Sequence, residues 1–183
     1  MTVVTKGSID LLGDATAELY DNATAELFDN AKAELFGNAK AELFDNATAT
    51  LFDNAKAELY RDARATLFGN AKAELFDNAT ATLFDNAKAE LYRDARATLF
   101  GNAKAELFDN ATAELFDNAK AVMCNNAKAT LYGDAKAYLR SNAKAENVTI
   151  IASSRATVHD TRNGKTYTAK EPGPCKVVPL PVR

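Results

Sequence analysis

The stretch DNATATLFDNAKAELYRDARATLFGNAKAELF, residues 45–76, decides the fold, because it holds four octads of one pattern and recurs unchanged at residues 77–108. In both directions the pattern extends over 17 consecutive octads, from Gly13 to Val148, without an insertion. Counted from its Asp, Gly or Arg, a typical octad has Ala at positions 3 and 5 and Leu at position 7. Such a short fixed period is typical of a solenoid, in which each repeat packs only on its neighbours.

The period of the apolar positions predicts strands, although Ala, Glu, Lys and Leu favour helices. Eight helical residues turn through about 800°, so an apolar stripe would drift by about 80° with every octad. Positions 3, 5 and 7 instead alternate with polar residues at positions 4 and 6, which is the period of a strand with one apolar face. Most octads begin with Asp-Asn, Gly-Asn or Arg-Asp, pairs that favour turns. Each octad is therefore predicted to form one strand and one turn.

The outward residues predict two octads, or 16 residues, in each turn of the solenoid. Stacking every sixteenth residue produces a Lys column, a Glu column, a Thr column and a column of alternating Asp and Arg. Because adjacent strands lie about 4.8 Å apart, Asp45, Arg61 and Asp77 would pair in succession. Three octads per turn would mix these columns. We therefore predict an all-β, two-sided β-solenoid (β-helix) of about nine turns, roughly 40 Å long, with terminal caps.

Composition divides the chain into three parts. Residues 1–12 form an N-terminal lead with a degenerate first octad, residues 13–148 form the octad repeat, and residues 149–183 differ in composition. The last part is predicted to be a strand and hairpin cap with a Pro-rich tail, because Pro cannot donate to a sheet. It either covers the last turn and blocks end-to-end stacking, or docks the rod to another molecule.

Specific strands are expected in the C-terminal part. Val148–Ile151 and Ala156–His159 have the composition of strands. Asn163-Gly164 favours a two-residue hairpin turn, with the returning strand at residues 165–168.

Charge and composition argue against several functional classes. A net charge of −3 at pH 7 is too small to predict capture of nucleic acid or of an acidic membrane surface. The first residues, MTVVTKGSIDLL, lack the basic and apolar regions of a signal peptide. No stretch approaches the roughly 20 apolar residues of a membrane span. We therefore expect a cytoplasmic or virion-associated protein without a membrane or nucleic-acid partner.

Candidate catalytic groups are confined to the C-terminal part. His159, the only histidine, would form a hydrolase group with Asp160 and Ser153 or Ser154 only if folding gave them the geometry of a triad. The alternative, which we favour, is an ordinary exposed imidazole. The sequence has no Gly-rich phosphate loop and no spacing typical of metal ligands. We expect no catalytic, metal or cofactor site, and no enzyme activity.

The two cysteines, Cys124 and Cys175, are too few for a disulfide framework. They could pair if the tail folds back, but a cytosolic compartment argues against the bond.

An aromatic residue ends almost every octad, at position 8, and two columns result. Alternation would direct the rings outward as stripes, and a long exposed apolar stripe is typical of an interface. Alternatively, the chain bends at this corner and the rings close off a core that is thin where it consists of Ala. Cys124 and Arg140 at this position indicate partial exposure near the C-terminal end. The candidate interface, for self-association or a protein partner, consists of Phe36, Phe52, Phe68, Phe84, Phe100 and Phe116.

The other outward columns form two different faces, one charged and one rich in Thr. The Lys and Glu columns are interpreted as a solvated face whose charges neutralise one another. The Thr residues form a candidate face of their own, which consists of Thr48, Thr50, Thr66, Thr80, Thr82 and Thr98.

The Thr-Ala-Thr steps at 48–50 and 80–82, on 16-residue turns, resemble the ice-binding solenoids, including bacterial ice nucleation proteins. The resemblance covers the turn length and two of the turns, and it implies an ice-binding face. The sequence departs from that pattern where Arg64 and Arg96 interrupt one Thr column. Glu replaces Thr in the other column, and the Gly-Tyr-Gly-Ser step of that family is missing.

Taken together, these patterns predict a non-catalytic scaffold or interaction rod that could form homo-oligomers, such as a phage or bacterial fibre or assembly component. Ice binding and a small hydrolase activity in the C-terminal part are the alternatives.

Overall fold

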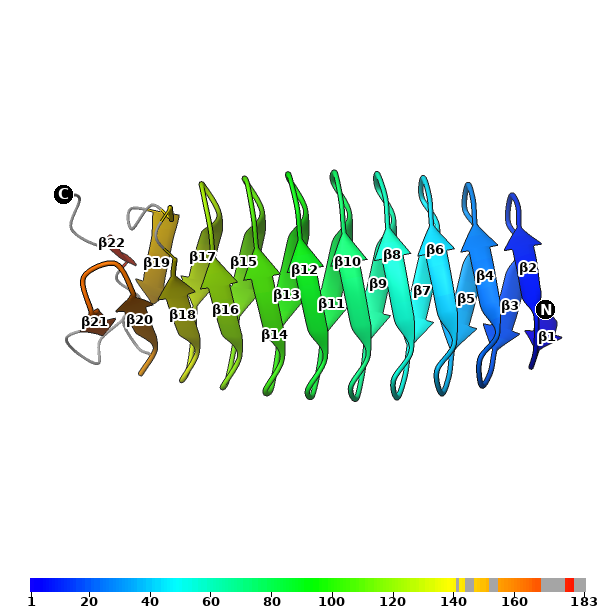
Figure 1. The fold of residues 1–183 in the computed structure, drawn as a ribbon, viewed down its shortest axis with the longest axis horizontal. Helices are drawn as coiled ribbons and strands as arrows, with labels where there is room; N and C mark the ends of the chain where they lie inside the picture. The colour runs from blue at the N-terminus through cyan, green and yellow to red at the C-terminus, as the bar shows by residue number, and fades with distance from the viewer. Residues whose placement is uncertain (141, 144–146, 152–154, 169–176, 180–183) are drawn as a thin grey trace.

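A computed structural model describes residues 1–140, 142–143, 147–151, 155–168 and 177–179, and its strands form two facing sheets in one rod (Figure 1). Sheet A contains, in spatial order, β1 (Thr2–Val4), β3 (Thr16–Leu19), β5 (Lys32–Leu35), β7 (Thr48–Leu51), β9 (Arg64–Leu67), β11 (Thr80–Leu83), β13 (Arg96–Leu99), β15 (Thr112–Leu115), β17 (Lys128–Leu131), β19 (Val148–Ile151) and β22 (Val177–Pro179). Sheet B contains β2 (Ser8–Leu11), β4 (Thr24–Leu27), β6 (Lys40–Leu43), β8 (Lys56–Leu59), β10 (Lys72–Leu75), β12 (Lys88–Leu91), β14 (Lys104–Leu107), β16 (Lys120–Met123), β18 (Lys136–Leu139), β20 (Thr157–Asp160) and β21 (Lys165–Thr168).

The pairing register confirms the 16-residue turn. Lys56 lies beside Lys72 and Glu58 beside Glu74 on parallel neighbouring strands, and the same spacing joins Thr50 to Thr66. The hydrogen-bond ladder continues beyond the strands, since the Asn38 amide donates to the carbonyl of Asp21 in the preceding turn, at 2.8 Å. The predicted all-β, two-sided solenoid of about nine turns is therefore confirmed.

From β2 to β17, each strand ends in a tight turn whose residue at position 1 of the next octad has a left-handed backbone. Asp21 has φ 58°, and the turn closes where the Ala23 amide donates to the carbonyl of Tyr20, at 3.0 Å. Asp, Asn and Gly tolerate this conformation, which explains their recurrence at position 1. Arg61 and Arg93 also adopt it, with φ 60°.

The predicted Asp–Arg column forms pairs and not a continuous chain. Arg61 forms an ion pair with Asp45 in the turn before it, and Arg93 does the same with Asp77. Among the described ion pairs, neither Arg reaches the Asp of the following turn. At the opposite corner, Asp alternates with Gly, and the carboxylates of Asp53, Asp85 and Asp117 each accept a hydrogen bond from the backbone amide of the Gly in the turn before, at 3.1–3.2 Å.

The core consists of the predicted inward positions. Leu at position 7 is fully buried from Leu19 to Leu139, with Met123 in the same role, and the Ala residues at positions 3 and 5 are also buried from Ala17 to Ala143. The polar residues at positions 4 and 6 are exposed or half-buried. The alternation of one apolar and one polar face therefore holds along the regular repeat.

The register changes after β18. Val148 of β19 pairs with Ala129, and Thr157 of β20 pairs with Lys136, so both spacings exceed 16 residues. The last predicted octad, SNAKAENV, has Asn147 where other octads have Leu or Met, and Asn is a poor core residue. The partner of Ala129 comes three residues later than the repeat predicts, and this residue, Val148, is fully buried.

The two ends of the rod differ. At the C-terminal end, β21 and β22 run antiparallel to β20 and β19, and together they close both sheets (Figure 1). The strands 148–151 and 165–168 are confirmed, and the strand expected at 156–159 lies one residue later. The hairpin is also present, but its loop has four residues, 161–164, and not the two of Asn163-Gly164. At the other end, β1 extends sheet A with a strand that the sequence did not predict, and Met1, Val3 and Leu12 are exposed there.

Candidate functional site

The aromatic residues at position 8 form two ladders of stacked rings at opposite corners of the rod. In the ladder of the candidate interface, successive Phe centroids from Phe36 to Phe116 lie 4.9–5.4 Å apart, with nearly parallel planes. The rings are half-buried, so they are neither fully outward nor tucked into the core. Since each ring covers the faces of its neighbours, the surface of the ladder consists of ring edges.

The second ladder is built in the same way at the other corner. It consists of Phe28, Phe44, Tyr60, Phe76, Tyr92 and Phe108. Cys124 follows in the same column, and its buried position raises the pKa of its thiol. The candidate disulfide to Cys175 lies outside the described residues.

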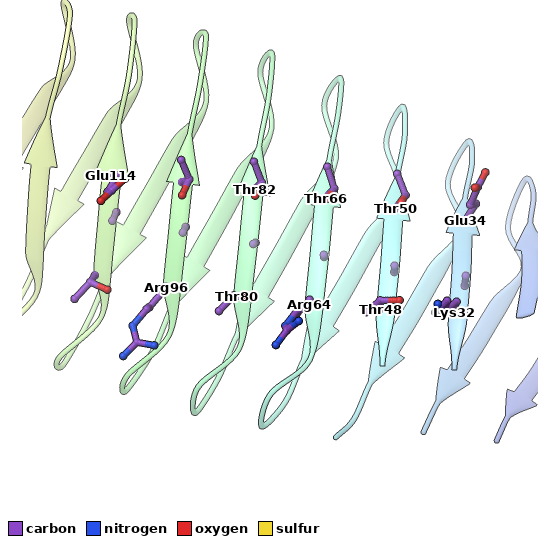
Figure 2. A pocket seen from close by; sticks show the side chains of 18 of the residues that line it. Lys32, Glu34, Thr48, Thr50, Arg64, Thr66, Thr80, Thr82, Arg96 and Glu114 are labelled. Carbon is purple, nitrogen blue, oxygen red and sulfur yellow. The ribbon is translucent and has the colours of Figure 1, made fainter. Parts of the chain in front are cut away.

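The predicted Thr face lies on the outer side of sheet A, along a shallow trough of about 1010 Å³ (Figure 2). Thr50, Thr66, Thr82 and Thr98 lie side by side in one column, and all are half-buried. In the neighbouring column, Thr48 and Thr80 alternate with Arg64 and Arg96, whose exposed side chains rise from the surface (Figure 2). The structure therefore brings the six candidate Thr residues onto one face, as a single continuous Thr column beside a mixed one.

The outer side of sheet B carries the Lys and Glu columns along a second trough, of about 900 Å³. No described Lys has its ammonium within 4.0 Å of a carboxylate, so the two columns do not form direct ion pairs. The neutralisation expected from the sequence therefore does not involve contacts between described side chains.

Two Glu carboxylates of sheet B are held by tyrosines of the second ladder. The Tyr60 hydroxyl donates to Glu58, and that of Tyr92 to Glu90, each at 2.6 Å. These hydrogen bonds to a carboxylate raise the pKa of each tyrosine to about 12. Burial, together with Glu58 and Glu90 on either side, raises the pKa of Glu74. The Glu column is thus a region of mutual repulsion, which the tyrosine hydroxyls relieve in part.

A third groove, of about 760 Å³, runs along one corner of sheet B, and the sequence analysis did not identify it. We call it the Asn–Lys groove, and it is lined by Asn22, Asn38, Asn54, Asn70, Asn86, Asn102, Lys40, Lys56, Lys72, Lys88, Lys104 and Lys120. The signal in the sequence is an Asn two residues before each Lys, every 16 residues. Because these Asn residues also favour turns, their repetition was attributed to the turns alone.

His159 and Asp160, two of the residues considered for a hydrolase, lie on opposite sides of β20. His159 is directed outward from β20, where its ring stacks on Tyr138 at 5.0 Å and contacts Thr166 at 3.0 Å. Asp160 is buried on the opposite side of the strand, where Arg162 donates to both carboxylate oxygens at 2.7 Å. This arrangement lowers the pKa of Asp160. Ser153 and Ser154 lie outside the described residues.

The described residues contain no group of three or more His, Cys, Asp or Glu side chains placed to hold a metal ion. Within the described ranges, no helix is long and apolar enough to span a bilayer.

No family model matches this chain, and no curated protein or solved structure matches it significantly.

Proposed function

We propose that this chain is a non-catalytic scaffold, a rod that associates with further copies of itself or with another protein, as in a phage or bacterial fibre or assembly component. The proposal rests mainly on the ladder of Phe36, Phe52, Phe68, Phe84, Phe100 and Phe116, which forms a straight, half-exposed apolar strip along the rod. Apolar strips of this kind are typical of protein interfaces.

The regular backbone supports a structural role. Hydrogen bonds join successive turns through both strands and corners, so the rod can hold many identical groups at fixed spacing. A ring in the ladder is packed against the rings above and below it, and little side-chain entropy remains to be lost on association. Binding along such a strip would therefore be cumulative, with a small contribution from each turn.

The test is a sizing experiment by light scattering on the variant Phe68→Ser, Phe84→Ser. Association of the wild-type chain should weaken by about tenfold or more, because two central rings of the strip are lost. The matched control is Phe44→Ser, Phe76→Ser in the second ladder, which should leave association unchanged if the first ladder is the interface. A wild-type chain that stays monomeric and captures no protein partner would contradict the proposal.

Ice binding is the second candidate, and the continuous column of Thr50, Thr66, Thr82 and Thr98 favours it. The alternation of Thr with Arg64 and Arg96 in the adjacent column weighs against it, because it breaks the flat array. Ice crystals grown with the wild-type chain should be faceted, and crystals grown with Thr50→Glu, Thr82→Glu should not. Glu already occupies this column at Glu34 and Glu114, so the fold should persist. Unaltered crystals with the wild-type chain would eliminate this candidate.

A further inference from the structure

The Asn–Lys groove presents the same two polar groups on successive turns of the solenoid. Lys40 pairs in register with Lys56, and the column continues through Lys72, Lys88, Lys104, Lys120 and Lys136. Neighbouring ammonium groups are therefore anchored about 4.8 Å apart. Such a row of like charges is unfavourable in isolation. It is the arrangement expected of a surface whose counter-charge comes from a ligand.

Two carboxylates of the neighbouring Glu column are engaged elsewhere. Glu58 and Glu90 accept hydrogen bonds from Tyr60 and Tyr92 at the opposite corner. At the groove's own corner, the Asp carboxylates at position 1 accept hydrogen bonds from the Gly amides of the preceding turn, at 3.1–3.2 Å. Carboxylates farther away are largely screened at physiological salt, because the Debye length is about 8 Å. No described Lys ammonium lies within 4.0 Å of a carboxylate, so no described side chain supplies the Lys column with a direct counter-charge.

We infer that the Asn–Lys groove binds a linear acidic polysaccharide, with the Lys ammonium groups on its carboxylates and the Asn carboxamides on its ring hydroxyls. A carboxamide both donates and accepts hydrogen bonds, as a sugar hydroxyl does. An extended chain of uronic acids repeats one carboxylate per sugar, at a spacing close to that between turns of the solenoid. Periodic contacts of this kind add along the rod, so a weak contact per turn gives useful affinity.

The same features disfavour a single-stranded nucleic acid as the occupant. Proteins that bind single strands stack the bases on open aromatic faces. Here the rings at the groove's corner, such as Phe52, Phe68 and Phe84, cover one another's faces and leave only their edges free. The groove thus supplies charge and hydrogen bonds without a platform for bases.

The experiment measures binding of polygalacturonate to the intact chain by affinity electrophoresis or calorimetry at low and moderate salt. The variant is Lys56→Thr, Lys72→Thr, Lys88→Thr, Lys104→Thr, and Thr24 already occupies this column, so the fold tolerates the change. We expect affinity at about 50 mM salt to fall by about tenfold or more, with a shallower dependence on salt, because four cationic contacts are lost.

A matched control removes the same charge from the other face. Lys32→Thr, Arg64→Thr, Arg96→Thr, Lys128→Thr neutralises four cations of sheet A, in a column that already contains Thr48 and Thr80. This control should lower the affinity by less than about threefold, through the long-range field alone.

A second variant tests the carboxamides without altering the Lys residues. Asn54→Asp, Asn70→Asp, Asn86→Asp places carboxylates in the groove, and Asp134 shows that Asp fits this position of the turn. It should reduce binding as strongly as the Lys variant. Asn46→Asp, Asn78→Asp, Asn110→Asp, at the opposite corner, is its control and should lower the affinity by less than about threefold, through the long-range field alone.

Three results would overturn the inference: no binding of polygalacturonate, equal losses in the two charge variants, or tighter binding of oligo(dT) than of polygalacturonate. Dextran, a neutral glucan, should not bind. The groove lies at the same corner as the Phe ladder of the scaffold proposal, but its lining residues and its ligand differ, and the Lys variant, which keeps every ring of the ladder, should associate with itself as the wild type does. The two proposals can therefore fail separately.

Discussion

The regular repeat and the C-terminal turn differ in the residue that occupies one core position, which is apolar in the repeat and charged in the C-terminal turn. Along the repeat, position 7 is a fully buried Leu or Met in every turn through Leu139. In β20, the residue that pairs with Leu139 is Asp160, which is also buried and is held by Arg162 and Asn163. A further apolar turn can pack on a Leu column, whereas a further apolar turn packed on the Asp160–Arg162 ion pair would desolvate both charges. Growth of the solenoid ends where the column changes from apolar to charged.

The regular repeat and the C-terminal end also differ in the direction of their strands. In the repeat, each strand offers its edge to a parallel copy of itself, which is how the sheets extend. β21 and β22 reverse direction, and Pro179 lies in β22, where it cannot donate to a further strand. Two hypotheses were given for the C-terminal part, a cap over the last turn and docking of the rod to another molecule. These features support the cap, and docking stays a hypothesis.

The largest expected effect comes from breaking the Leu column in the middle of the repeat. Leu75→Ala should lower the free energy of unfolding by about 2–5 kcal/mol, because it removes a fully buried side chain and leaves a cavity. Denaturant unfolding followed by circular dichroism measures the change. The outward neighbour Lys72→Thr is the control, with an expected change within about 0.5 kcal/mol. Equal effects would show that the column does not carry the stability.

The corresponding change at the C-terminal turn should be smaller and local. Asp160→Ala removes the partner of Arg162 and should destabilise this turn by about 1–3 kcal/mol. Hydrogen exchange should quicken in β20 and β21 while the central strands keep their protection, since solenoid turns are stabilised mainly by their neighbours. Loss of protection along the whole rod would contradict a local role for the pair.

Acid should also distinguish the two regions. The pKa of Asp160 lies below its usual value of 3.8, chiefly because Arg162 donates to its carboxylate. As the pH falls below about 4, the unfolded chain takes up a proton that the folded turn still excludes. The contribution of this pair is therefore present above the ordinary pKa and is lost as the pH falls through the lowered one. Hydrogen exchange of β20 should show this dependence in the wild type, and Asp160→Asn should abolish it.

The smallest effect concerns the charges at the corner of sheet B, where Asp and Gly alternate. Gly69→Asp would lie between Asp53 and Asp85 and should cost about 0.5–1 kcal/mol at low salt, recovering at high salt. Gly69→Asn is the uncharged control, since Asn125 adopts the same left-handed backbone. If both variants are equally stable at low salt, repulsion between turns does not explain the alternation.

Much of the candidate surface could also be predicted from the 16-residue repeat of the sequence. The Thr and Lys columns lie where every sixteenth residue placed them, because the register is the same on all regular turns. The half-buried, stacked arrangement of the aromatic rings could not be predicted from the period, because alternation along a strand does not fix the direction of a side chain at a corner. The Asn–Lys groove was missed because one Asn can serve both the turn and the surface.

The sequence by itself determined the strand and turn of each octad, the 16-residue register and the identity of the core. These properties depend on alternation and repetition, which are visible in a string of residues. The tertiary structure alone decided that the rings stack edge-outward, that each Arg pairs only with the Asp before it, and that Asp160 is buried at the end of the Leu column. Those outcomes depend on distances between side chains from different turns, and no local pattern encodes them.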